Sequence, residues 1–333
     1  MKQVVEVINE LKEWERVHTP YDRTTRLNLF QFVIEEGTGG KLVPLSTGLE
    51  KQETEAIQMP NLTLSDHAFG QYLNRLGYPA QLFKRLPGKL NIMNLNWLSQ
   101  FGGYDKDVLV RVQDNSIARA LMSKVYQPFD TLELLELAEP FMEGAVVRWH
   151  YDDKMTFHLS VSFPNYAEEI RKGDIIERGF HVSNSEVGIR SVRVAGYTHR
   201  LVCTNGAISR GEGDSFNFRH TGDHDQMRDM IRTAIETSKL ETERIIAQFK
   251  NALNVKVEEP FDFLQKTFKE NNLTVEQFKA SLTELMGSQD KDNLFGISQS
   301  ISGAAKGFEG EKSYEMQRLS VEITDPSRIL SLN

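Results

Sequence analysis

The sequence predicts an α+β protein, with a central antiparallel sheet, N-terminal helices and a C-terminal helical region containing one long helix. Near both ends of the chain, apolar residues recur at steps of three and four, the period of an amphipathic helix. Between these ends, short β-branched and aromatic runs alternate with turn residues, which is typical of antiparallel strands. We expect three regions: an N-terminal helix and strand region at 1–105, a central β-rich core at 106–224 and a C-terminal helical region at 225–333.

The N-terminal region is expected to begin with a helix at 3–17, where apolar residues occupy every third or fourth position. An apolar and aromatic run at 27–37 then predicts a strand. The sequence KLVPLS (41–46) is the expected partner of this strand, across a turn at 38–40.

Residues 61–88 carry the signals of two short helices. Ser65 suits an N-cap, Gly77 suits the left-handed position after a helix, and Pro79 suits the first turn of the next one. Basic residues near the second helix keep open a DNA-reading helix-turn-helix. We favour a helical hairpin packed on a sheet, because helix pairs are common supersecondary units.

The central region predicts a series of strands. The sequences at 145–151 and 155–163 flank a short polar turn at 152–154, which indicates a hairpin. A short helix rich in Leu and Glu is expected at 131–141. The further expected strands are 108–114, 179–184, 189–196, 199–205 and 217–221.

The C-terminal region predicts one long amphipathic helix over 225–252, packed on the central sheet or on a copy of itself. A shorter helix is expected at 274–286, since Thr274 and Gln277 have the spacing of a capping box. Residues 287–313 are rich in Gly and Ser, so we expect a loop there, around a small apolar segment.

The overall composition excludes several classes of protein. With 39% hydrophobic and 26% charged residues, the chain is neither disordered, nor collagen-like, nor an integral membrane protein. A net charge of −8 excludes a polycation that coats nucleic acid, although it permits a local basic groove. Cys203 is the one cysteine, so no intrachain disulfide forms. We therefore expect a cytoplasmic protein without a signal peptide or a membrane partner.

Positive charge gathers at 187–211, a stretch of 25 residues with four arginines and no Asp or Glu. Arginines on a sheet hold phosphates, and neighbouring aromatic rings stack on bases, so the stretch predicts binding of single-stranded nucleic acid. The alternative is that these arginines pair with acids of the long helix. The expected binding residues are Arg190, Arg193, His199, Arg200, Arg210, Arg219 and His220, with Tyr197, Phe216 and Phe218 as stacking rings.

A second candidate site involves histidine and cysteine. His199 and Cys203 are four residues apart, as are His220 and His224, and together they suggest a zinc site. Their spacing matches no known closed zinc motif, so we expect no metal. Cys203 is open to two further interpretations: a small buried residue, or a nucleophile with His220 as its base. Asn205 is the remaining weak catalytic candidate.

Asn205 and Gly206 predict a sharp turn after a buried strand at Leu201 and Val202, because Asn-Gly tolerates positive φ. We expect this turn to meet the element at 219–221 in one polar site, with a purely architectural role as the alternative. The chain lacks the glycine-rich phosphate loop, the dinucleotide-binding glycine motif, HExxH and CxxC, so we expect no cofactor.

Four motifs occur in order along the chain: ARALMSKVYQPFD (118–130), RLVCTNGAI (200–208), RHT (219–221) and NLFGISQSISGAA (293–305). Together they resemble the phage/plasmid-like protein family, a domain of unknown function found in bacteriophages, plasmids and bacteria. The last motif departs from the family, which has an Asn-Ala pair and a Thr at positions where this chain has serines and a glutamine. The resemblance singles out these polar positions: Arg119, Ser123, Tyr126, Asp130, Cys203, Asn205, His220 and Thr221.

The resemblance implies a mobile-element protein and no particular reaction. Our first hypothesis is a phage-type nucleic-acid-binding protein, for single strands, acting in replication or recombination. One alternative is an enzyme acting on a nucleotide or phosphodiester around Cys203 and His220. Another is an anti-host protein that binds its target through the acidic helical end of the chain. We also expect a copy of the chain itself as a partner.

Overall fold

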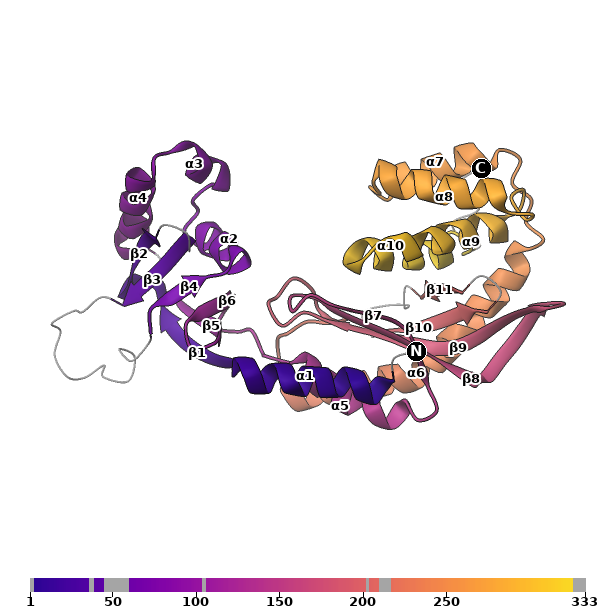
Figure 1. Ribbon diagram of the computed structural model, residues 1–333, viewed down its shortest axis with the longest axis horizontal. Coiled ribbons are helices and arrows are strands. Elements are labelled where there is room, and N and C mark those ends of the chain that lie inside the picture. Colours follow the sequence, from indigo (N-terminus) through magenta and orange to yellow (C-terminus); the bar gives the residue numbers. More distant parts are fainter. Residues whose placement is uncertain are drawn as a thin grey trace. The chain divides into compact units, whose positions relative to one another are not determined.

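The structure, a computed structural model, describes residues 3–35, 39–44, 60–103, 106–201, 204–209 and 217–325 (Figure 1). The chain forms two compact units. The N-terminal unit is Glu10–Pro128, and the C-terminal unit combines Met1–Asn9 with Phe129–Asn333. Both contain a sheet and helices, so the α+β class is confirmed. The three-part division at 105 and 224 stays a prediction.

The N-terminal unit has a sheet with the order β1-β5-β6-β4-β3-β2, antiparallel except for the parallel pair β4–β6. The expected pairing of 27–37 with KLVPLS is confirmed, since β2 and β3 are antiparallel neighbours with Phe32 opposite Leu42. The elements are α1 (Val4–His18), which starts in the other unit, β1 (Tyr21–Arg26), β2 (Phe30–Glu35), β3 (Gly39–Pro44), β4 (Leu62–Leu64), α2 (Asp66–Arg75), α3 (Ala80–Arg85), α4 (Gly88–Phe101), β5 (Asp107–Gln113) and β6 (Ile117–Ser123).

The expected helical hairpin is α2 and α3. The Ser65 hydroxyl accepts a hydrogen bond from the backbone N–H of Ala68, and Gly77 ends the first helix with a φ of 64°. The second helix has six residues. Tyr72 and Leu73 of α2 are buried in the core over the sheet, so the pair serves as a packed hairpin. Helix α4, which follows, was not expected from the sequence.

The C-terminal unit has an antiparallel sheet with the order β11-β10-β9-β8-β7, and β12 pairs with β10. The hairpin around 152–154 is confirmed as β7 and β8. The strand expected at 189–196 continues through Tyr197 and Thr198 as β10, which ends at Arg200. Of the separate strand expected at 199–205, only the first two residues therefore belong to β10, and Asn205 begins the next strand. The elements are α5 (Thr131–Ala138), β7 (Val146–Asp152), β8 (Phe157–Arg171), β9 (Asp174–Asn184), β10 (Val192–Arg200), β11 (Asn205–Ile208), β12 (Asn217–Phe218), α6 (His224–Ala252), α7 (Pro260–Glu270), α8 (Val275–Gly287), α9 (Leu294–Ala304) and α10 (Gly310–Glu322).

Helix α6 packs on one face of this sheet, as expected for the long helix (Figure 1). That face is apolar, because Leu159 and Val161 of β8 alternate with polar residues that point the other way. Gly196 of β10 allows the helix to approach closely: a Cβ at this position would lie 3.2 Å from the backbone oxygen of Ser238. The opposite face of the sheet lies toward α9 and α10.

The predicted loop at 287–313 is wrong, since α9 and the start of α10 lie there. All residues of α9 are buried, and its serines bond to backbone oxygens instead of water. Ser298 donates to the oxygen of Ser320, and Ser302 donates to that of Gly206, both at 2.6 Å. Small residues therefore serve close packing here rather than a loop. Within the described ranges, no helix combines the length and apolarity that crossing a membrane requires.

Candidate functional site

The face of the β7–β10 sheet opposite α6 is lined by polar side chains, and we call it the polar face. Strand alternation places them together: Ser160 lies opposite His181, and Arg193 lies opposite Ser183. The sequence contained a signal for this face, since polar residues occupy every second position of 158–162, but our sequence interpretation did not use it. The polar face consists of Trp149, His158, Ser160, Ser162, Glu177, His181, Ser183, Arg193, Tyr197 and His199.

A chain of polar contacts crosses the middle of the polar face. The Ser160 hydroxyl lies 2.9 Å from Nδ1 of His181, and Nε2 of His181 lies 3.4 Å from Nδ1 of His158. Both histidines are fully buried, and the Trp149 ring stacks on His181 with centroids 5.8 Å apart. Burial lowers the pKa of His158 to about 3, helped by the positive charge of Arg190. Both histidines are therefore neutral near pH 7, because burial also lowers the pKa of His181 well below its ordinary value.

Arg190 and Arg193 gather around Tyr314 of α10 at one end of the polar face. Their guanidinium carbons lie 5.3 and 5.4 Å from the centroid of the Tyr314 ring. Arg193 also contacts the Tyr314 hydroxyl and donates to the Asn217 side chain. Arg190 forms an ion pair with Glu311, whose side chain is 46% exposed. Burial, together with the charge of Arg193, lowers the pKa of Arg190. Two guanidinium groups thus contact the ring of Tyr314, beside the partly exposed carboxylate of Glu311.

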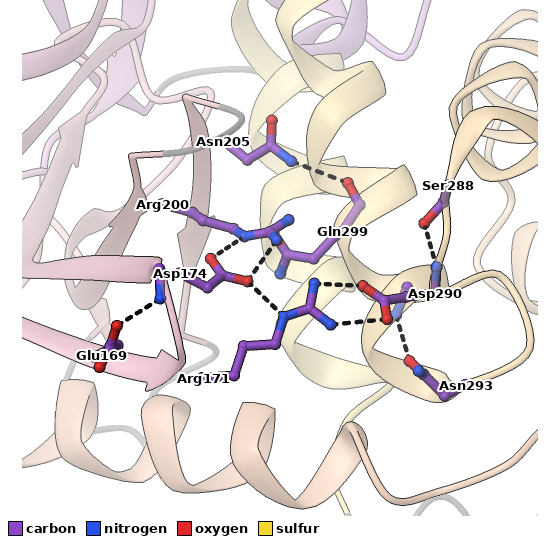
Figure 2. Close-up of polar contacts among 11 residues, drawn as sticks. Glu169, Arg171, Asp174, Arg200, Asn205, Ser288, Asp290, Asn293 and Gln299 are labelled. Atoms are coloured by element: carbon purple, nitrogen blue, oxygen red, sulfur yellow. Dashed lines mark hydrogen bonds and ion pairs between the residues drawn. The ribbon is translucent and has the colours of Figure 1, made fainter.

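Arg200 has a different environment, shown in Figure 2. Its Nε and Nη2 atoms each donate to Asp174 at 2.6 Å, and the two side chains are only 10% and 5% exposed. Arg171 forms a second two-point contact, with Asp290, at 2.8 and 2.6 Å. Both arginines lie over the Phe295 ring of α9, at 5.1 and 5.7 Å. This cluster connects the sheet to the C-terminal helices.

Arg190 and Arg200 are each paired with an acid, but the alternative that the long helix supplies these acids is wrong. Their acids come from α10 and β9 and not from the long helix α6. His199 is buried as well, which lowers its pKa to about 4, so it carries no charge near pH 7. Tyr197 is fully buried, with its hydroxyl 3.4 Å from Nδ1 of His199.

The predicted turn at Asn205-Gly206 is wrong, because these residues begin β11. The chain turns just before them, at Thr204, which has a φ of 52°, and Leu201 is 39% exposed rather than buried. The Asn205 amide donates to the backbone oxygen of Gln299 at 3.2 Å, so the RLVCTNG motif meets the C-terminal motif here (Figure 2).

The remaining predicted residues are spread over the unit. Arg219 is exposed, and His220 is buried in the link between β12 and α6. His224 lies 3.2 Å from Glu133 of α5. Among the residues with described positions, no group of three His, Cys, Asp or Glu side chains is arranged to hold a metal. Three predicted residues lie outside the described part of the chain: Cys203, Arg210 and Phe216.

A cavity of about 380 Å³ lies on the other face of the sheet, beside α6. Phe163 and Phe180 form apolar walls, and Ser238 of α6 lies at the lining. Arg178 at its rim is already paired with Glu168 and Glu243. These ion pairs balance the charge of Arg178, and none of the predicted binding residues lines this cavity.

Comparison with known proteins gives a family without an assigned function. The model of the domain of unknown function DUF932 matches residues 120–305, more than half of the chain. No curated protein and no solved structure matches the chain. The matched region includes all strands of the polar face, whereas α4 and α10 lie outside it.

Proposed function

This chain belongs to the DUF932 family, and we propose that it binds single-stranded nucleic acid at the Arg190–Arg193 end of the polar face. The two guanidinium groups bind backbone phosphates, and the partly exposed ring of Trp149 provides a stacking surface for a base. The proposal keeps Arg190 and Arg193 from the sequence hypothesis and omits Arg200, which is committed to Asp174.

One observation carries the proposal: two arginines share the Tyr314 ring next to a carboxylate that is exchangeable. Glu311 is 46% exposed, so its carboxylate is already partly hydrated and gains hydration when it moves away from Arg190 into water. A phosphate oxygen in its place keeps the charge balance of Arg190. Arginine also matches phosphate better than lysine does, because its planar fork donates two parallel hydrogen bonds.

Two further features favour a single strand. Aromatic rings stack on bases, and the faces of bases are accessible when the strand is unpaired. His158 and His181 are neutral near pH 7, so these histidines add no positive charge to that of Arg190 and Arg193 at this end of the polar face. Binding is therefore expected to be moderate in strength and to weaken steeply with salt.

The biological setting belongs to the same proposal. The resemblance to the phage/plasmid-like proteins favours a mobile-element protein of the host cytoplasm, acting in replication or recombination. The single cysteine agrees with a reducing compartment. The enzyme hypothesis around Cys203 and His220 stays a prediction, since Cys203 is outside the described residues.

The test is fluorescence anisotropy with labelled single-stranded DNA and RNA at about 50 mM salt, where phosphate contacts are strong. Arg193→Lys keeps the positive charge and removes the planar guanidinium. It should therefore weaken binding by about tenfold, which corresponds to the loss of roughly one hydrogen bond to a charged group. Absence of binding by the wild-type protein at this salt concentration contradicts the proposal.

Glu311→Gln is the complementary variant, because it removes the carboxylate that pairs with Arg190 at a residue that is itself 46% exposed. We expect tighter binding of the single strand. Glu236→Gln, on the exposed side of α6, changes the net charge equally and serves as the matched control. If both variants gain the same affinity, the tighter binding follows from the change in net charge, and this result would contradict binding at this site.

A further inference from the structure

Helix α4 of the N-terminal unit buries two polar side chains beside Leu95 and leaves several large apolar side chains exposed. Its buried residues include Asn91 and Ser99, which are 2% and 1% exposed. Trp97 and Phe101, in contrast, are 58% and 69% exposed. A surface helix of a globular protein ordinarily presents polar residues to solvent, so the exposed side of α4 departs from the usual pattern.

Hydrogen bonds fix the inward orientation of the polar residues. The Asn96 side chain accepts from the backbone N–H of Phe32 at 2.6 Å and donates to the oxygen of the same residue at 3.0 Å. The Asn91 amide accepts from the Tyr78 hydroxyl at 2.7 Å, and the Ser99 hydroxyl donates to the Leu27 oxygen at 2.8 Å. The outward face of the helix is therefore determined by specific contacts, and it cannot rotate inward without losing them.

The outward face carries one stripe of four large apolar residues at steps of three, four and four. Leu90 and Met93 are 42% and 59% exposed, and Trp97 and Phe101 follow. Exposed apolar residues that occur singly need no explanation, but a contiguous row on one helix marks an interaction surface. Trp, Met and Phe are also enriched at the centres of protein–protein interfaces.

The stripe is nearly free of charge. Lys89 is the one charged residue in the sequence of α4, and residues 67–104 contain no Asp or Glu. A depletion of charge at the centre is typical of surfaces that become buried against protein. The basic residues lie before or at the N-terminal end of the helix, and none follows Lys89 within α4.

We propose that this stripe pairs with the same stripe of a second copy of the chain, as two antiparallel α4 helices around a two-fold axis. The order of residues supports this pairing, because two aliphatic residues precede two aromatic ones. An antiparallel register places Leu90 opposite Phe101 of the partner subunit and Met93 opposite Trp97 of the partner subunit. Each aliphatic side chain then meets an aromatic ring, including a favourable sulfur–aromatic contact.

The electrostatics of the helix ends agree with the antiparallel arrangement. It places Lys89 near the C-terminal end of the partner's helix, where the macrodipole is negative. A parallel pair would instead bring both Lys89 ammonium groups to the same end. Because α4 belongs to the N-terminal unit and Arg190 and Arg193 belong to the C-terminal unit, this contact uses none of the residues of the proposed nucleic-acid site.

The test is analytical ultracentrifugation of the full chain over a range of concentrations. We expect a reversible dimer for the wild-type protein and a monomer for Trp97→Glu, which introduces a charge into the stripe. Val275→Glu, at a residue 68% exposed on α8, is the control and should remain dimeric. Because Trp97 is exposed, circular dichroism should show an unchanged fold for Trp97→Glu.

The register has its own test in a Cys203→Ser background. A mixture of the Leu90→Cys and Phe101→Cys proteins should form a mixed disulfide dimer much faster than either protein alone. A wild-type monomer at all concentrations overturns the proposal, as does a dimer that survives Trp97→Glu. A monomer that floats with phosphatidylserine vesicles, and no longer does so after Trp97→Glu, would show that the stripe binds a lipid surface. This result would also overturn the proposed dimer.

Discussion

The two ends of strand β10 use arginine in different ways. Arg200, at one end, forms a two-point ion pair with Asp174, and both side chains are at most 10% exposed. Arg193, near the other end, lies with Arg190 around Tyr314, and the carboxylate beside them belongs to the half-exposed Glu311. Arg200 and Arg193 are seven positions apart on the same strand. Arg200 is thus buried with a buried carboxylate, whereas Arg193 lies near a carboxylate that a ligand can replace.

The difference shows what an acid-free stretch of sequence means. The absence of acids at 187–211 says nothing about partners from elsewhere in the chain, and Arg190 and Arg200 pair with different acids outside this stretch. Burial of the partner decides the role of the pair. A buried carboxylate cannot be replaced without a large cost, whereas a surface carboxylate exchanges with a ligand at low cost.

The largest expected effect concerns the Arg200 end. Asp174→Asn leaves a buried guanidinium without a counter-charge, so it should lower the free energy of unfolding by about 3–5 kcal/mol. Urea unfolding followed by circular dichroism measures this change. If the free energy of unfolding falls by less than about 1 kcal/mol, the Arg200–Asp174 pair behaves like a surface ion pair. The two ends of β10 would then not differ in the way described.

The next effect concerns the neutral histidines of the polar face. The folded state holds the pKa of His158 at about 3, while the unfolded chain has about 6.5, so the unfolded state binds more protons between these values. Stability should therefore fall as the pH decreases from 6.5. Each such histidine contributes a slope of up to about 1.4 kcal/mol per pH unit. His158→Gln should give a shallower slope over pH 6.5–4.5 than the wild type in urea titrations; an unchanged slope contradicts the burial argument.

The smallest expected effect on stability is at the other end of β10. Glu311→Gln removes an ion pair between Arg190, whose side chain is 16% exposed, and a half-exposed carboxylate, so the free energy of unfolding should fall by about 1 kcal/mol, the upper end of the range for surface pairs. The melting temperature should change little, in contrast to Asp174→Asn. A destabilisation as large as that of Asp174→Asn would mean that Glu311 is a structural partner of Arg190 and not an exchangeable one.

Local signals in the sequence predicted much of the fold. The capping box at Thr274 and Gln277, the N-cap at Ser65 and the hairpin around 152–154 all depend on neighbours within a few residues, and all three are present. Helix α9 was mistaken for a loop because its Ser and Gly residues are typical of loops. Their burial against other helices is a tertiary effect, which local propensity does not contain.

The candidate site was predictable in part. Arg190 and Arg193 stood out through the missing acids, but Tyr314 and Glu311 lie more than 100 residues further along the chain and carry no local signal. The stripe on α4 was missed for a related reason. Its asparagines bond to backbone groups of β2 and α3, so polar residues share the buried side of the helix with Leu95.

The most direct test of the Arg190–Arg193 site is the salt dependence of single-strand binding. Each phosphate contact contributes about −0.7 to the slope of log K against log salt for single strands. The double variant Arg190→Gln/Arg193→Gln should therefore reduce the magnitude of the slope by about 1.4 if each arginine binds one phosphate, with Arg232→Gln on the surface of α6 as the control. A slope equal to that of the wild-type protein would contradict the account, because the two arginines would then make no phosphate contact.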